Sequence, residues 1–296
     1  MAILVNRDTR VLIQGVTGRS GTQVTGELLD YGMRVLAGVT PGKGGQEIEA
    51  VPVFNSIKEA VEQIGPVDVS MVYVPPLLAY EAAIEAIEAQ IPLIHIFAEK
   101  IPIFDTCRIL SMAAKKNVRV LGPASVGAIS PGEGKIGSIG GPKPEAVFSK
   151  GPVGVVSRSG GMCAELGLLI SNAGLGQSTV VGIGGDLLIG MDLSDVLLNF
   201  EADAQTKVVV AFGEVGGSQE IEASRLLKNG QVTKPVIVFL AGTFAESLPK
   251  DTSLGHAGAI VGLETTMKEK IKTLKDCGAV VAEKFEDIPL LIKKSL

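Results

Sequence analysis

The chain has 296 residues, 46% of them hydrophobic, and a net charge of −5 at pH 7, which suits two domains with a core in each. The acidic balance and an aromatic content of 4% argue against nucleic-acid binding. There is no charged leader and no apolar run near the roughly 18 residues of a membrane span, so we expect a soluble cytoplasmic protein. The three cysteines lack the spacing of metal ligands, which predicts neither a disulfide framework nor a metal site.

The first elements are a strand, a glycine-rich loop and a helix. Residues 10–14 form an apolar strand, residues 15–22 contain three glycines, and a helical pattern continues to about Tyr31. Such a loop turns tightly and brings backbone N–H groups and the positive end of the helix to a phosphate. Its spacing, G-x-x-G-x-x-G, departs from the G-x-G-x-x-G pattern of dinucleotide-binding sites.

The second strand, at residues 35–39, bears on the kind of ligand. In an NAD site this strand ends on an acid that binds the ribose hydroxyls. Here it continues into a glycine-rich loop that carries Lys43. Because a lysine suits an extra phosphate, the loop favours coenzyme A or NADP over NAD, although an ordinary exposed turn has a similar composition.

Apolar strands and amphipathic helices then alternate. Strands are predicted at 69–74, 93–97 and 118–121, with helices near 77–89 and 104–116, which indicates a parallel sheet covered on both faces. Pro75, Ala98 and Glu99 follow strand ends, where ligands of such sheets bind. We expect His95, inside a strand, to be a packed core residue. Residues 122–151 are rich in Gly and Pro and are predicted to connect two domains.

A second alternating series follows, with strands at 153–156, 179–183, 208–212 and 236–240. Residues 157–162 lead into a helix to about Ala173 and supply serine and glycine groups for a second anion site. Glu214 follows a strand, and His256 lies between two glycines that leave space at its ring. The strand at 236–240 leads through a loop to His256, which predicts that Glu214 and His256 meet at the same edge of the sheet. A carboxylate can fix the tautomer of an imidazole and stabilise its cation. Alternatively, His256 is a turn histidine and Glu214 a solvated acid.

Six motifs occur in one order along the chain. They are Q-G-V-T-G-R-S-G-T at 14–22, G-V-T-P-G-K-G-G at 38–45, V-S-R-S-G at 156–160, V-G-I-G-G-D at 181–186, G-E-V-G-G at 213–217 and G-H-A-G-A at 255–259. Together they resemble the α subunit of succinyl-CoA synthetase, and the similar segment of ATP-citrate lyase, over essentially the whole chain. The resemblance implies an α/β protein with a CoA-binding Rossmann-like domain at residues 1–125, followed by a flavodoxin-like CoA-ligase domain at residues 126–296.

The resemblance also implies a reaction and a partner. His256 would be phosphorylated by ATP or GTP, held with Mg²⁺ on a separate ATP-grasp (β-type) large subunit of a heteromer. The phosphoryl group would pass to a small carboxylic acid, and the CoA thiol would attack the acyl phosphate. By the same resemblance Glu214 stabilises the imidazole, and Ser159, Gly160 and Gly161 bind the phosphate. The implied CoA contacts are Thr17, Gly18, Arg19, Ser20, Lys43, Pro75, Phe97, Ala98 and Glu99.

Two departures from the succinyl-CoA synthetase pattern bear on the acid substrate. The chain has G-P-A-S-V-G at 122–127 instead of G-P-N-C-P-G, which places Ala124 and Ser125 in the implied substrate region. It has S-G-G-M-C-A-E at 159–165 instead of S-G-T-L-T-Y-E, so Ala164 replaces the tyrosine that contacts substrate. Both variants resemble ATP-citrate lyase, and a roomier pocket suits a tricarboxylate. We therefore expect a citryl-CoA synthetase small subunit, whose product would be cleaved by another protein, ahead of a succinate–CoA ligase α subunit.

Two readings from other classes stay open at this point. The first is a non-catalytic protein that binds or senses CoA through its first domain alone. The second is an NADP oxidoreductase, which is weakened by the missing acid after the second strand and by the irregular glycine spacing.

Overall fold

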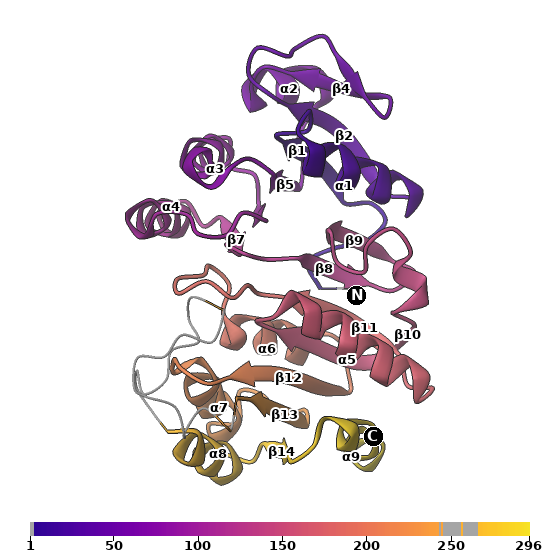
Figure 1. Cartoon of the computed structure of the whole chain (residues 1–296), viewed down its shortest axis with the longest axis vertical. Helices are drawn as coiled ribbons and strands as arrows, with labels where there is room; N and C mark the ends of the chain where they lie inside the picture. Colours follow the sequence, from indigo (N-terminus) through magenta and orange to yellow (C-terminus); the bar gives the residue numbers. More distant parts are fainter. Residues whose placement is uncertain (1–2, 243, 245–255, 257–265) are drawn as a thin grey trace.

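The computed structural model describes residues 3–242, 244, 256 and 266–296. The chain forms two sheets, one above the other in Figure 1, with the N-terminal sheet at the top. The connection between them runs from the end of β7 (Arg119–Leu121) to β8 (Gly127–Ser130). The residues in between therefore lie between the carboxyl end of the first sheet and the start of the second.

The first sheet has the Rossmann arrangement that the resemblance implied. Its strand order is β3-β4-β2-β1-β5-β6-β7, with every pair parallel except β3 and β4. The order reverses direction between β1 and β5, which makes that point the ligand-binding crevice of an open parallel sheet. Besides β7, the elements of this domain are β1 (Arg10–Gln14), α1 (Arg19–Asp30), β2 (Arg34–Val39), β3 (Glu47–Ile48), β4 (Val51–Phe54), α2 (Ile57–Ile64), β5 (Val69–Val72), η1 (Pro76–Leu78), α3 (Ala79–Glu88), β6 (Leu93–Ile96) and α4 (Ile103–Lys115).

The second sheet contains the flavodoxin-like order β11-β10-β12-β13-β14, again with parallel pairs. Two antiparallel strands, β8 and β9, extend its edge beside β11. Besides β8, the elements are β9 (Gly134–Gly137), η2 (Pro144–Ala146), β10 (Lys150–Ser157), α5 (Gly160–Asn172), β11 (Gln177–Gly182), α6 (Leu193–Ala202), β12 (Val208–Glu214), α7 (Gln219–Lys228), β13 (Val236–Ala241), α8 (Met267–Asp276), β14 (Val280–Ala282), η4 (Phe285–Asp287) and α9 (Ile288–Ser295).

The sequence explains why these segments form strands and helices. The central strands are rich in Val, and all seven residues of β12 are buried, as expected for strands covered by helices on both faces. Several helices begin at a capping residue: Ser56 accepts the Glu59 N–H, and Asp192 and Thr266 form capping boxes. These caps fix where the three helices start.

The predicted connection over residues 122–151 is wrong in part, because it contains the β8–β9 hairpin. Gly127 and Gly137 face each other in this hairpin with φ of +104° and +81°, and a Cβ on either would lie within 2.2 Å of a backbone oxygen. Only glycine fits so close an approach. Lys135 on β9 is fully buried and lies 3.5 Å from Glu27 of α1, so the hairpin joins the two domains through a buried ion pair.

Candidate functional site

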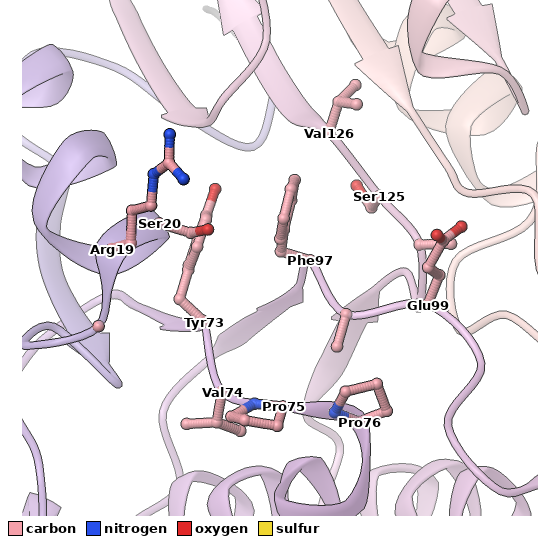
Figure 2. A pocket seen from close by; sticks show the side chains of 13 residues that line it. Arg19, Ser20, Tyr73, Val74, Pro75, Pro76, Phe97, Glu99, Ser125 and Val126 are labelled. Atoms are coloured by element: carbon pink, nitrogen blue, oxygen red, sulfur yellow. The ribbon is translucent and has the colours of Figure 1, made fainter.

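A cavity of about 570 Å³ opens at the carboxyl ends of β1, β5 and β6 (Figure 2). Its walls come from the start of α1, from the segments that follow β5 and β6, and from the connection between the domains. It is lined by Gly18, Arg19, Ser20, Tyr73, Val74, Pro75, Pro76, Phe97, Ala98, Glu99, Ala124, Ser125 and Val126. Seven of the nine residues that the sequence assigned to CoA binding are therefore in one place, and we call this the first cavity.

The glycine loop after β1 shapes one end of the first cavity. A Cβ on Gly21 would lie 2.2 Å from the Gly15 carbonyl oxygen, so glycine is required for the start of α1 to pack against the loop. Helix α1 has Gly18 at its N-cap and therefore no capping side chain, which leaves its first N–H groups available to an anion. Figure 2 shows Arg19 and Ser20 beside this helix start.

Thr17 and Lys43 lie outside the lining of the first cavity. The Thr17 hydroxyl lies 3.2 Å from the Thr40 hydroxyl, and the Lys43 N–H donates to the Thr40 carbonyl at 3.0 Å. The Asn55 side chain accepts hydrogen bonds from the backbone of this exposed loop, which holds its shape. The loop is thus anchored next to the glycine loop, and its lysine is in solvent.

The opposite wall of the first cavity is aromatic. The Phe97 ring stacks on the Tyr73 ring with centroids 4.8 Å apart and planes 8° apart. Phe97 is 37% exposed, whereas Tyr73 is buried at 7%, so the Phe97 face is the one presented to a ligand. An exposed aromatic face in a cavity suits a flat or apolar group of a ligand.

A second cavity, of about 430 Å³, lies between the first cavity and the carboxyl end of the second sheet. Its lining combines the connection between the domains with the segments after β10 and β11 and with His256. It is formed by Glu99, Lys100, Ala124, Val126, Arg158, Ser159, Gly160, Gly161, Gly185, Asp186 and His256. Because Glu99, Ala124 and Val126 also line the first cavity, the two cavities share a wall.

His256 and Glu214 are brought together as the sequence suggested. The Nδ1 atom of His256 lies 2.7 Å from Glu214 Oε2, and Glu214 is buried where β12 ends. A nitrogen of the Arg158 guanidinium lies 3.5 Å from the other Glu214 oxygen, Oε1. One carboxylate thus contacts the imidazole and a buried cation at once. The reading of Glu214 as a solvated loop acid is therefore wrong.

The charges around His256 favour its protonated form. The hydrogen bond to Glu214 raises the pKa of His256 above its usual value, partial burial opposes this, and Glu99 adds to the rise while Arg158 reduces it. Burial also raises the pKa of the nearby Asp186 carboxyl, and Glu99 acts in the same direction. A neutral His256 that donates from Nδ1 to Glu214 keeps a lone pair on Nε2, which is the nucleophilic form of the ring.

The start of α5 faces the same cavity. Ser159 is its N-cap, with Oγ accepting from the Met162 N–H, and Gly160 and Gly161 form the first turn. A Cβ on Gly160 would lie 2.2 Å from a Val126 methyl group, so glycine lets the helix end approach the connection between the domains. Ala164, one turn further along α5, lies outside the cavity lining.

His95 is the packed core residue that its strand position predicted. It is completely buried, and burial lowers its pKa to about 4, so the ring is neutral. Its Nε2 lies 2.9 Å from the Ser125 carbonyl oxygen and holds the connection that both cavities share.

Sequence reasoning did not assign Tyr73, Lys100, Arg158 or Asp186 to the site. Each follows a strand directly or within a few residues, so position at a strand end was the signal that could have identified them. The proposed reactive segment around His256, residues 253–260, otherwise lies outside the described residues. In the part of the chain that the structure describes, no three side chains are grouped as metal ligands, and no helix is long and apolar enough to cross a membrane.

Comparison with known proteins agrees with this arrangement. Residues 6–100 match the CoA binding domain family, and residues 156–280 match the CoA-ligase family. Over its full length the chain is 42% identical to the succinate–CoA ligase [ADP-forming] subunit alpha 1 of Archaeoglobus fulgidus, of which it covers 99%. The chain belongs to the succinate–CoA ligase α-subunit family. It is similarly related, at 41% identity and over 95% of that protein, to the α subunit from Aquifex aeolicus.

The chain is also similar to solved structures of citrate enzymes. The ATP citrate lyase of Methanosaeta concilii, in complex with (3S)-citryl-CoA, aligns with 99% of the chain at a TM-score of 0.91 and 27% identity. The chain spans 50% of that lyase. The ATP citrate lyase of Methanothrix soehngenii, in complex with citrate and coenzyme A, aligns with a TM-score of 0.90 at 27% identity and is likewise spanned over 50% of its length. The protein is thus a CoA-ligase subunit with a CoA-binding domain followed by a CoA-ligase domain.

Proposed function

We propose that the chain is the CoA- and histidine-bearing subunit of a nucleotide-dependent ligase that converts citrate to citryl-CoA, with phosphorylated His256 as an intermediate. The observation that carries the proposal is the shared wall of the two cavities. A CoA molecule whose phosphates lie near Arg19 and whose chain passes Phe97 would bring its thiol toward the cavity that contains His256.

His256 is suited to accept a phosphoryl group at Nε2. Its Nδ1 is occupied by Glu214, which directs the lone pair of the neutral ring to Nε2. The product would be a phosphoimidazole with a negative group at the start of α5, where backbone N–H groups and the helix dipole favour an anion. Arg158 adds a buried positive charge, and its Nε has no hydrogen-bond partner among the described residues.

Two group transfers then follow the phosphorylation of His256. A carboxylate oxygen of the acid attacks phosphorus, the bond from phosphorus to Nε2 breaks, and an acyl phosphate forms while the imidazole regains its lone pair. The CoA sulfur attacks the acyl carbon, the bond from that carbon to the phosphate oxygen breaks, and the thiol proton ends on the phosphate that leaves as the thioester forms. Charge shifts in each step, and hydrogen-bond donors that are already positioned around the reacting atoms contribute most to the stabilisation of such transition states.

The nucleotide and Mg²⁺ are proposed to bind to a partner. The relatives are named as α subunits, and the lyases, which carry more than this chain, are about twice its length. We infer an ATP-grasp β-type subunit that phosphorylates His256 with ATP or GTP. His256 is 36% exposed, so its ring is accessible from outside the chain.

Citrate is favoured by the residues around the second cavity. Lys100 and Arg158 line it beside the acids Glu99 and Asp186, and each of the two cations can pair with a carboxylate other than the reacting one. Ala164 lies one turn after Gly161 on α5, and helical side chains lean toward the N-terminus, so a tyrosine at 164 would reach over the cavity mouth. Succinate is the second candidate, because relatives at 42% identity are named for it.

The experiment is the intact mass of the chain, purified with its ATP-grasp partner, after Mg-ATP and then after CoA with citrate or succinate. We expect a gain of one phosphoryl group that is lost on addition of CoA and citrate, and no gain in His256→Asn. Discharge by succinate alone would assign the second candidate instead. No phosphoryl gain in an assembled complex that still binds CoA would overturn the ligase and leave a CoA-binding or CoA-sensing protein.

The acid can be tested further with Ala164→Tyr. This substitution is expected to lower kcat/KM for citrate more than for succinate, since the added ring reduces the space near Gly161. Met162→Leu, at a neighbouring position of the same helix turn, is the matched control because it keeps volume and polarity. Equal losses for both acids would contradict a role of residue 164 in substrate size.

A further inference from the structure

Helices α7 and α8 bury an ion pair that the reaction above does not use. Lys270 of α8 donates from Nζ to Glu220 Oε2 of α7 at 2.8 Å, and the two side chains are 0% and 2% exposed. A buried ion pair is weak evidence for stability, because desolvation of both charges offsets their attraction. Its position in the molecule therefore calls for another explanation.

The pair is built around the backbone of Glu214. Lys270 Nζ also donates to the carbonyl oxygens of Glu214, at 3.0 Å, and Gly216, at 2.9 Å. Glu220 Oε1 accepts the N–H of Glu214 at 3.2 Å. Both backbone polar groups of Glu214 are thus bound by one ion pair, and all three protons of the ammonium are used.

The glycine before Glu214 is part of the same arrangement. A Cβ on Gly213 would lie 2.4 Å from Glu220 Oε1, so only glycine lets the carboxylate reach the end of the strand. Beyond residue 214 the chain leaves the sheet, and no strand among the described residues pairs with the backbone there. The ion pair supplies at this point the hydrogen bonds that the sheet supplies elsewhere.

We propose that Lys270 and Glu220 are positioning residues that hold the end of β12 so that the Glu214 carboxylate stays in hydrogen-bond contact with His256 Nδ1. The side chain of Glu214 is buried, which restricts its rotamers, so a change in its backbone position is carried to its carboxylate. Among the described residues, the other charged groups in the cavity with His256 are Arg158, Glu99, Lys100 and Asp186, which come from other elements. None of these four contacts Lys270 or Glu220 in the hydrogen bonds and ion pairs of the described residues.

The chain has two histidines, which makes a direct test simple. The full chain is labelled with ¹⁵N-histidine, and the ring nitrogens are followed by NMR as the pH is changed. In Lys270→Met we expect the His256 Nδ1 signal to lose its hydrogen-bonded shift and the His256 pKa to fall, because the carboxylate contact is weakened. The buried His95 reports on the fold, and its signals are expected to stay unchanged.

Lys135→Met is the matched control, since it removes the lysine of the other buried ion pair, with Glu27, away from His256. It is expected to leave the His256 signals unchanged. Glu220→Gln is a second variant that keeps the side-chain shape but has one acceptor oxygen, so it cannot serve both Lys270 and the Glu214 N–H. We expect the same change at His256 in Glu220→Gln as in Lys270→Met.

An unchanged His256 in folded Lys270→Met and Glu220→Gln would overturn the proposal, as would an equal change in Lys135→Met. Loss of the native His95 signals in both variants would show that the pair only maintains the fold. The NMR readout needs neither nucleotide nor acid, so it stands or fails apart from the proposed function. With the partner and Mg-ATP, phosphorylation should slow by about 10-fold or more, the size typical of losing an orienting group, while the Kd for CoA stays unchanged.

Discussion

Replacing Gly185 by alanine is expected to displace the His256 ring without disturbing the rest of the chain. The added Cβ would lie 2.7 Å from Cδ2, 2.8 Å from Cγ and 3.1 Å from Nε2 of His256. Carbon atoms in contact are about 3.5–4.0 Å apart, so the ring must move by about 1 Å. A move of that size directed away from Glu214 stretches the 2.7 Å contact between Nδ1 and Glu214 Oε2 beyond hydrogen-bond range.

A misplacement of about 1 Å costs a reaction on the order of 10²-fold in rate, and we expect that loss in the phosphorylation of Gly185→Ala. The assay is rapid quenching of the assembled complex with Mg-ATP, followed by mass measurement of the phosphorylated chain. The Kd for CoA should not change, because Gly185 does not line the first cavity. Gly26→Ala is the control, with nothing nearer than 4.0 Å to its Cβ. Phosphorylation of Gly185→Ala at the wild-type rate would refute the reasoning.

Three other predictions concern single groups. Glu214→Gln removes the charge that raises the pKa of His256, so the acid limb of the phosphorylation rate should move to lower pH and the maximal rate should fall; an unmoved limb would contradict the pair. In urea titrations the wild type is expected to lose about 3 kcal/mol of stability between pH 6.5 and 4, because the imidazole of His95 binds a proton there in the unfolded chain and not in the folded one. His95→Gln should remove this loss, and an equal pH dependence in the variant would refute the reasoning. Phe97→Ala should raise the Kd for CoA by about 10-fold in calorimetry, and an unchanged Kd would exclude the aromatic wall from the CoA site.

The parts of the fold that follow regular patterns were predictable from the sequence. Apolar strands that alternate with helices predicted both parallel sheets, the glycine loop and the residues at strand ends indicated part of the first cavity, and the family resemblance supplied the set of CoA contacts. This works because the carboxyl ends of parallel strands meet at one edge, so residues distant in sequence, such as Gly18 and Phe97, meet there too. The predicted pairing of His256 with Glu214 has the same origin, since His256 was assigned to the strand edge that carries Glu214.

What escaped prediction depends on contacts that no local pattern encodes. Each strand of the β8–β9 hairpin has four residues with a single Ile, and Lys135 is typical of a surface, so no apolar run marks these residues as buried strands. Lys270 lies in a helix rich in lysine and is fully buried, because its three acceptors come from two distant segments. Polar residues whose burial depends on tertiary partners are read from the sequence as exposed.

The ion pair between Lys135 and Glu27 bears on how this protein can be divided. Glu27 belongs to the first domain and Lys135 to the second, and the pair lies where the two domains meet. A chain cut between the domains would leave this lysine and this glutamate unpaired on newly exposed surfaces. Water would solvate both charges, but the cut would also divide a hydrophobic cluster that contains residues of both domains, among them Val11, Ile136 and Val209, and would expose apolar surface. Neither half is then expected to be an independent building block. The citrate lyases, which match the two domains as one block, are consistent with a module that is inherited undivided.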